Sequence, residues 1–100
     1  MITGPIEDVC YVRHRVRDVE YFAATAGSGE PVLLLHGFPQ THYCWRHLIP
    51  TLAVSGHAVV APDLRGYGRS HARPGGPRGE GFTKREIAGE LVQLMQLLGF

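Results

Sequence analysis

Two stretches near the start of the chain are typical of strands. Residues 11–17 alternate loosely between apolar and polar positions, as in a strand with one face in water, and residues 19–24, which carry Tyr21 and Phe22, indicate a second strand. A hairpin around Asp18 would join them. The segment 26–31 combines Gly, Ser and Pro, which predicts a turn.

Two later stretches, 32–35 and 58–62, are apolar without alternation. Strands that are apolar on both faces are typical of a parallel sheet covered by helices on each side. Between them, residues 42–54 show apolar positions spaced i, i+3, i+4, i+7, which predicts a helix face. Pro50 interrupts this pattern, so we expect a short first turn, a restart with Pro50 near a helical N-terminus, and an end at Gly56. The face consists of Trp45, Leu48, Ile49 and Leu52.

A helix over residues 83–98 is predicted by both its start and its periodicity. Thr83 and Glu86 form a capping box, and apolar residues recur at helical spacing until Gly99. The order of elements is strand, strand, strand, helix, strand, helix. The alternation in the later portion predicts an α/β fold with a parallel sheet.

Composition limits the class of protein and of partner. The chain has 100 residues, of which 44% are apolar, so we expect at most one domain. A net charge of +1 without charge runs argues against a nucleic-acid partner, and no apolar run has the ~20 residues that span a membrane. The N-terminus carries acids where a signal peptide has a basic region. Cys10 and Cys44 match no metal or redox spacing, so we expect two free, buried thiols and a cytoplasmic location.

The sequence His36-Gly37-Phe38-Pro39 follows directly on the strand predicted at 32–35. Ligands of open α/β sheets lie outside the carboxyl ends of the strands. Gly37 allows a positive φ or a close ligand approach, and Pro39 restricts Phe38 to extended conformations. Together they would direct the Phe38 backbone N–H into a cleft as half of an oxyanion hole. The alternative is a tight turn that packs an aromatic residue.

A second polar segment, residues 63–70, follows the strand predicted at 58–62. Gly66 and Gly68 resemble the start of a dinucleotide fingerprint, but the third position is His71 and no helix opens there, so we reject that interpretation. The simpler interpretation of Asp63 and Arg65 is a brace of salt bridges and backbone hydrogen bonds within the loop.

Three segments carry a resemblance to a known family. They are "VLLLHGFPQTHYCWRHLIPTLA", "VVAPDLRGYGRS" and "FTKREIAGELVQLMQLLG". Together they resemble the first part of α/β-hydrolase-fold enzymes, over about residues 9–100. Within that fold the chain most resembles the haloacetate dehalogenases and next the epoxide hydrolases.

The resemblance implies roles for individual residues. Phe38 would give its backbone N–H to the oxyanion hole, while His36, Gly37 and Pro39 would shape the loop that carries it. The positions that match a loop used mainly structurally are Asp63, Gly66 and Gly68. The resemblance also implies a small-molecule substrate in the full enzyme and no metal or organic cofactor.

The nucleophile of that family has no counterpart in this sequence. Dehalogenases and epoxide hydrolases place an aspartate, and esterases a serine, on a sharp elbow after the helix predicted at 83–98. Neither a Gly-His-Asp-x-Gly nor a Gly-x-Ser-x-Gly pattern occurs. The histidines other than His36 fit solvated faces or loops, and Ser70, His36 and Asp63 make no convincing triad. We therefore expect residues 1–100 to be part of an α/β-hydrolase domain without nucleophile elbow, cap or catalytic histidine.

Two hypotheses remain from the sequence. In the first, the chain is an N-terminal segment of a hydrolase and is inactive alone. In the second, it is a truncated, non-catalytic polypeptide or an assembly module. The family's sheet order would leave the strand at 32–35 unpaired on one side, so self-association through that edge is expected. A nucleophile elbow encoded shortly after Phe100 favours the first hypothesis, and an immediate stop codon favours the second.

Overall fold

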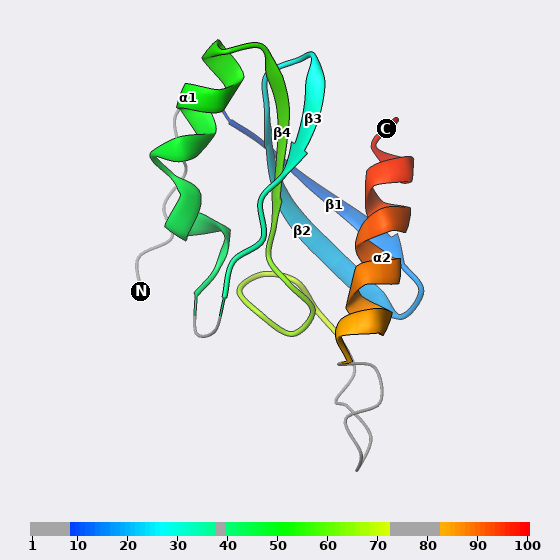
Figure 1. Cartoon of the computed structure of the whole chain (residues 1–100). Helices are drawn as coiled ribbons and strands as arrows, with labels where there is room; N and C mark the ends of the chain where they lie inside the picture. Colours follow the sequence, from blue (N-terminus) through cyan, green and yellow to red (C-terminus); the bar gives the residue numbers. More distant parts are fainter. Residues whose placement is uncertain (1–8, 38–39, 73–82) are drawn as a thin grey trace.

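The computed structural model describes residues 9–37, 40–72 and 83–100. Four strands form one sheet in the order β1-β2-β4-β3, with helices on both sides of it (Figure 1). The strands are β1 (Cys10–Val16), β2 (Val19–Ala26), β3 (Glu30–Leu33) and β4 (His57–Pro62). The helices are a 3₁₀ turn (His42–Trp45), α1 (Leu48–Val54) and α2 (Lys84–Leu97). β1, β2 and β4 pair antiparallel, whereas β3 and β4 pair parallel. The α/β fold predicted from the sequence is confirmed.

The hairpin around Asp18 is confirmed, with Val16 opposite Val19 and Arg17 at φ 55° in the turn. The bounds of the third strand were wrong. It begins at Glu30 and ends at Leu33, so Pro31 lies inside it. Pro31 is tolerated because β3 is at the edge of the described sheet, where its outward row of backbone N–H groups pairs with no strand among the described residues. For the same reason this apolar stretch is half-buried or exposed rather than fully buried.

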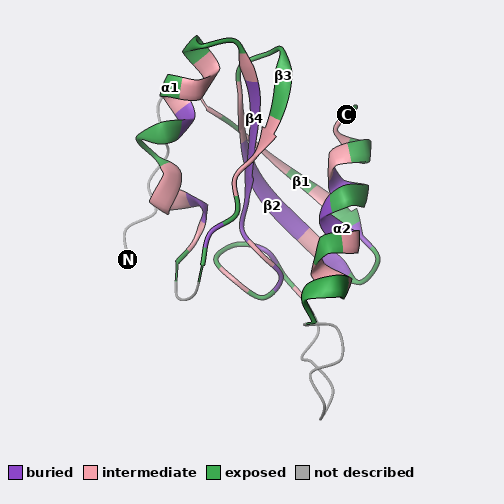
Figure 2. Ribbon diagram, viewed as in Figure 1, coloured by how far each residue is buried: buried purple, intermediate pink, exposed green. Residues whose placement is uncertain are grey.

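The two helices cover opposite faces of the sheet and divide the core in two (Figure 2). Alternate residues of a strand point to opposite faces, so β2 and β4 serve both halves. On the α1 side the buried cluster is Ala24, Ile49, Val59 and Ala61. On the α2 side it is Val16, Val19, Tyr21, Leu91 and Leu94.

The predicted helix signals act largely as expected. The Glu86 N–H donates to the Thr83 hydroxyl (3.2 Å), and that hydroxyl donates to the Glu86 carboxylate (2.9 Å). Residues 42–54 form a short turn and then α1, with Pro50 in its first turn. Gly56, at φ 92°, follows the end of α1. Of the expected apolar face, Ile49 is buried, but Leu48 is 38% exposed.

A buried chain of polar side chains ties α2 to the hairpin. The Tyr21 hydroxyl donates to Glu90 (2.7 Å), and Arg65 donates to the other oxygen of Glu90 (2.8 Å). Arg65 also forms a two-pronged ion pair with Asp18 (2.9 and 3.0 Å). These contacts neutralise the charges of Glu90 and Arg65, which are 2% and 3% exposed. The predicted bracing role of Arg65 is confirmed.

Two smaller expectations concern cysteines and membrane segments. The prediction of two buried thiols is wrong, because Cys10 is exposed on the outer strand and Cys44 is half-buried; both are free. Partial burial raises the pKa of the Cys44 thiol. Within the described ranges, no helix has the length and apolar character needed to cross a bilayer.

Candidate functional site

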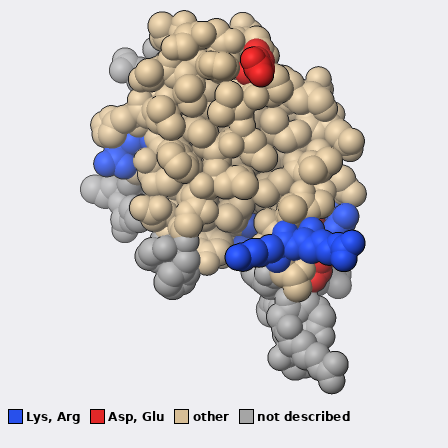
Figure 3. All heavy atoms as spheres, viewed as in Figure 1, with Lys and Arg blue, Asp and Glu red and all other residues tan. Residues whose placement is uncertain are grey.

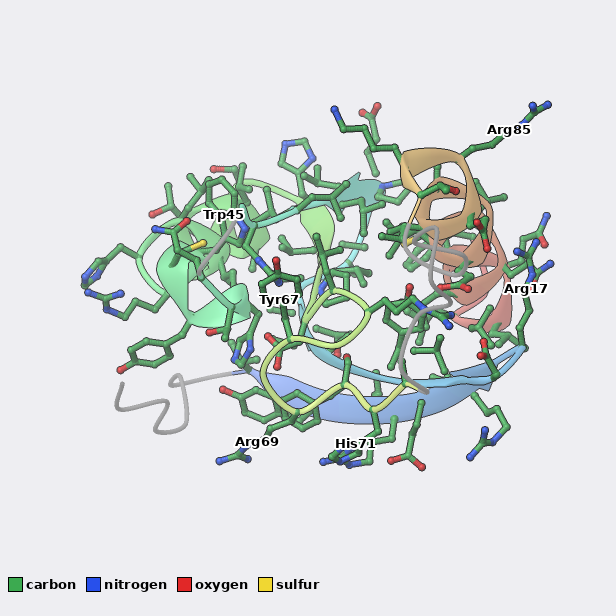
Figure 4. The ribbon with its side chains drawn as sticks, turned by 90° about the horizontal axis from the view of Figure 1, so that it is seen from below. Arg17, Trp45, Tyr67, Arg69, His71 and Arg85 are labelled. Atoms are coloured by element: carbon green, nitrogen blue, oxygen red, sulfur yellow. The ribbon has the colours of Figure 1, made fainter. Side chains whose placement is uncertain are left out.

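The segments that follow β3 and β4 lie together at the carboxyl ends of these two parallel strands. Residues 34–37 leave β3, and residues 63–72 form a loop after β4. Figure 4 views this end of the sheet directly: Tyr67 lies within the loop, while Arg69 and His71 lie toward β1. The carbonyl of Arg69 accepts a hydrogen bond from Arg13 of β1 (3.0 Å). The described parts of the two candidate segments therefore lie at the same end of the sheet.

Asp63 joins the two segments. Its Oδ1 accepts from both the backbone N–H and the ring Nδ1–H of His42, each at 2.7 Å. Its Oδ2 accepts from the Arg69 N–H at 2.9 Å. A carboxylate only accepts hydrogen bonds, so the Nδ1 of His42 must carry a proton. The predicted bracing role of Asp63 is confirmed.

The environment of Asp63 favours its charged form. Burial alone would raise the pKa of this 1% exposed carboxyl group. The hydrogen bonds from the His42 ring, the Arg69 N–H and the His42 N–H outweigh burial and hold the pKa below its ordinary value. Asp63 is therefore an anion fixed within a cage of donors, and its lone pairs are used for structure.

His36 forms a second connection between the segments. Its Nε2 accepts from the backbone N–H of Leu64 (2.9 Å), so this nitrogen is unprotonated. Its Nδ1 then carries the proton and faces the carbonyl of Gly37 (3.2 Å). The ring also meets Tyr67 edge to face, with centroids 5.2 Å apart. His36 is 5% exposed. One ring nitrogen contacts the backbone of its own segment at Gly37, and the other contacts the backbone of the second segment at Leu64.

Ser70 is also engaged in structure. Its hydroxyl donates to the carbonyl of Asp63 (2.6 Å) and accepts from the N–H of Phe22 in β2 (2.9 Å). Ser70 is 4% exposed. Both hydrogen bonds of this hydroxyl go to backbone groups, and neither partner is a base that could take its proton. The Ser70 hydroxyl therefore anchors the loop and is not placed as a nucleophile.

The glycines of the site differ from one another. Gly66 and Gly68 adopt positive φ values of 78° and 52°, and a Cβ on Gly68 would overlap the carboxylate of Asp63. Glycine at 68 therefore serves both the turn and the close approach of Asp63. Of the two reasons considered for Gly37, a positive φ is excluded, because Gly37 is not among the glycines with positive φ; a Cβ there would meet no described atom within 4 Å. The other expected reason for Gly37, approach of a ligand, stays a prediction.

Phe38 and Pro39 lie outside the described residues, so the predicted oxyanion donor stays a prediction. The residues that flank them are held together, because the Gln40 N–H donates to the carbonyl of Gly37 (2.8 Å). His42, two residues further on, is fixed to Asp63. Among the residues that the structure describes, no group of His, Cys, Asp and Glu is arranged to hold a metal ion.

Sequence reasoning missed the role of His42. We expected it on a solvated face or in a loop without a functional contact, but it is 2% exposed, because Asp63 and the rings of Tyr11 and Phe22 surround it. The only signal in the sequence was a histidine four residues after His-Gly-Phe. Its partner is 21 residues away, and no periodicity links the two.

Comparison with known proteins gives consistent relatives. A family model described as alpha/beta hydrolase fold matches residues 30–100. Epoxide hydrolase 1 of Siraitia grosvenorii is 43% identical over 81 residues, which is 81% of this chain and 25% of that protein. A fluoroacetate dehalogenase of a Burkholderia species is 42% identical over 85 residues, covering 85% of this chain and 28% of its own.

A solved structure gives the same result. The crystal structure of an epoxide hydrolase from Vigna radiata superposes with a TM-score of 0.84 at 38% identity. The match covers 97% of this chain and 31% of that one. The chain thus spans roughly a quarter to a third of the length of these relatives. Its four-stranded mixed sheet and two helices correspond to the N-terminal part of the fold, and the chain belongs to the α/β-hydrolase fold family.

Proposed function

We propose that this chain forms the N-terminal part of a hydrolase that works through a covalent ester intermediate, with haloacetates or epoxides as its substrate class. The relatives named above include an epoxide hydrolase and a fluoroacetate dehalogenase. One observation carries the proposal. The hydrogen bonds between His42 and Asp63 connect the segment that follows β3 with the loop that follows β4.

The proposed contribution of the chain is electrostatic. In the first step a carboxylate oxygen attacks carbon, and either halide leaves or the epoxide C–O bond opens, which forms an ester. In the second step water, which loses a proton to a base outside residues 1–100, adds to the ester carbonyl, and an oxyanion develops; its collapse breaks the ester C–O bond, releases the alcohol product and regenerates the carboxylate. The Phe38 N–H would donate to that oxyanion, because the Gly37–Gln40 hydrogen bond and the His42–Asp63 pair hold both flanks of Phe38.

The nucleophile must come from elsewhere. Residues 1–100 contain neither of the two elbow patterns. The Ser70 hydroxyl already donates one structural hydrogen bond and accepts another. We therefore expect residues 1–100 alone to be inactive. We assign the protein to the cytoplasm, on the strength of its two free thiols.

The experiment is to express the coding frame that carries this chain as far as its own stop codon, alongside residues 1–100. Both products are assayed for chloride release from chloroacetate and for diol formation from styrene oxide. Turnover by a longer product, with none from residues 1–100, supports the proposal. Turnover by residues 1–100, or a longer product that is folded and inactive on both substrates, contradicts it.

The second candidate is a non-catalytic polypeptide that assembles through its open sheet edge. The position of β3 at the end of the strand order favours it. A coding frame that stops at Phe100 would select this candidate over the first.

A further inference from the structure

Phe22 of β2 contacts both members of the buried pair that connects the two loops. Its backbone carbonyl accepts from the Asp63 N–H (2.8 Å), and its ring meets the His42 ring with centroids 5.7 Å apart and planes inclined by 61°. Its own N–H donates to the Ser70 hydroxyl (2.9 Å), which anchors the loop after β4. Phe22 is 6% exposed. A shift of this residue would therefore move Asp63, His42 and the loop together.

Arg13 of β1 lies over the ring of Phe22. The two residues are opposite each other in the β1–β2 pair, and the guanidinium carbon of Arg13 is 4.9 Å from the ring centroid. A cation over an aromatic face is attracted by the negative potential of the ring. The same guanidinium donates to the carboxylate of Glu20 (3.0 Å). Two kinds of contact thus fix the guanidinium of Arg13 over Phe22.

Arg13 also contacts the loop after β4 directly. Its guanidinium donates to the backbone carbonyl of Arg69 (3.0 Å), and Figure 4 shows Arg69 on the β1 side of the loop. The Arg69 N–H in turn donates to Oδ2 of Asp63 (2.9 Å), and the Arg69 guanidinium carbon lies 5.5 Å from the centroid of the Phe22 ring. Arg13 therefore reaches Asp63 by two routes, one through Phe22 and one through the backbone of Arg69.

The contacts of Arg13 lie at the surface, unlike the pair that they support. The side chain of Arg13 is 42% exposed, whereas that of Asp63 is 1% exposed. Exposed ion pairs contribute little to the free energy of unfolding, because water competes for both partners. Removal of the Arg13 side chain should therefore leave the fold nearly as stable while loosening the loop. This difference separates an effect on loop position from a loss of folded protein.

We infer that Arg13 is a positioning residue of the hydrolase proposed above, and the inference rests on that proposed function. Arg13 keeps the loop after β4 against the β1–β2 hairpin, so that Asp63 holds His42 and the segment that includes the proposed oxyanion donor, Phe38. It acts through these residues and not on the substrate. The oxyanion develops when water attacks the ester, whereas the ester forms without that donor. Loss of Arg13 should therefore slow hydrolysis of the ester and leave its formation unchanged.

The test uses a chimera in which residues 1–100 replace the matching segment of the Vigna radiata epoxide hydrolase named above. In single turnovers with styrene oxide, mass spectrometry follows the formation and the decay of the covalent ester. Arg13→Met keeps an unbranched side chain but loses the donors and the charge, so ester decay should slow by at least about threefold. Arg13→Lys keeps a charge and a donor, so its ester should decay at an intermediate rate.

Two further variants control for the loss of a positive charge. Arg15→Met changes an exposed residue of the same strand that forms no ion pair with the described residues. Figure 3 shows a group of basic side chains at the foot of α2, where Arg85 is exposed, and Arg85→Met removes one charge there. Both variants should match the unsubstituted chimera. The inference is overturned if Arg13→Met slows neither step or slows both alike, or if all three Met variants slow ester decay equally.

Hydrogen exchange tests the inference without catalysis. In residues 1–100, Arg13→Met should speed exchange of the His42 and Arg69 amides, which both donate to Asp63, by at least about threefold. The amides of α2 should keep their wild-type rates, because only a loss of global stability would speed them too. Arg15→Met should change neither set. An unsubstituted chimera that forms no ester contradicts the proposed function, whereas unchanged exchange at His42 and Arg69 contradicts the role of Arg13.

Discussion

The His42 ring and the Asp63 carboxylate meet at 2.7 Å, with both side chains almost completely buried. Asp63 directly follows the strand β4, and His42 lies five residues beyond Gly37 in the segment that follows β3. One buried pair thus connects the segment after β3, whose sequence includes the proposed oxyanion donor, with the loop after β4. The stability of this pair decides how firmly those loops are held.

Replacing Asp63 with Asn should destabilise the chain markedly. The amide can keep one acceptor for His42, but its NH₂ group would then face the N–H of Arg69. Two donors facing each other in a buried site leave one of them unpaired, so we expect a loss of about 2–4 kcal/mol in the free energy of unfolding. Urea denaturation measures it. Glu20→Gln is the control: its ion pair with Arg13 is exposed, and a loss of about 0–1 kcal/mol is expected. Equal losses would contradict a special role for Asp63.

The lowered pKa of Asp63 predicts a dependence of stability on pH. In the unfolded chain the carboxyl group of Asp63 has a pKa of about 3.9, and in the folded chain its pKa is lower. The folded state therefore gains stability from the ionised form above about pH 4, and this gain is lost as the pH falls through the folded-state pKa. The difference in unfolding free energy between wild type and Asp63→Asn should shrink on going from pH 6 to pH 3. A difference that stays constant over this range would contradict the prediction.

Gly68 should tolerate alanine much less well than Gly56 does. Both have positive φ, at 52° and 92°, so both substitutions strain the backbone by about 1–2 kcal/mol. A Cβ at 56 meets open space among the described residues, but a Cβ at 68 would displace the carboxylate of Asp63. We expect Gly68→Ala to cost at least about 1 kcal/mol more than Gly56→Ala in urea denaturation. Equal costs would show that the carboxylate can move freely.

Tyr21 and Glu90 should be energetically coupled. The Tyr21 hydroxyl is buried, and burial together with the nearby Glu90 raises its pKa, so the hydroxyl remains a donor at all ordinary pH values. Tyr21→Phe leaves one oxygen of Glu90 without this bond and should cost about 1–3 kcal/mol. A double-mutant cycle with Glu90→Ala, which removes the acceptor, should give a coupling energy of about 0.5–3 kcal/mol. A coupling energy near zero would mean that the hydrogen bond contributes nothing to stability.

Local patterns predicted much of the fold. The capping residue Thr83 and the apolar spacing after it placed α2 within one residue at each end, because a helix start depends on neighbours in sequence. The apolar run ending at Pro62 placed β4 equally well. The bounds of β3 were wrong because Pro31 is a turn residue by composition, and only the strand order makes it an acceptable edge residue.

Long-range polar contacts could not be predicted. Glu90 looks like a solvent-facing helix residue, yet it is buried because Tyr21 lies 69 positions away in sequence and Arg65 lies 25 positions away. Likewise, nothing local to His42 indicates that Asp63 would bury it. The site residues were located by their position after strands, whereas their partners depend on how the strands are ordered.

The most direct measurement concerns the backbone N–H of Phe38. Residues 1–100 replace the matching segment of the Vigna radiata epoxide hydrolase, and the chimera is compared with its Phe38→Pro and Phe38→Ala variants. Proline removes the N–H while alanine keeps it, so only Phe38→Pro should slow ester hydrolysis, by about 10²–10³-fold. Mass spectrometry should then find about one covalent ester per Phe38→Pro enzyme. If Phe38→Pro turns over as fast as Phe38→Ala and holds no ester, the Phe38 amide is not the oxyanion donor.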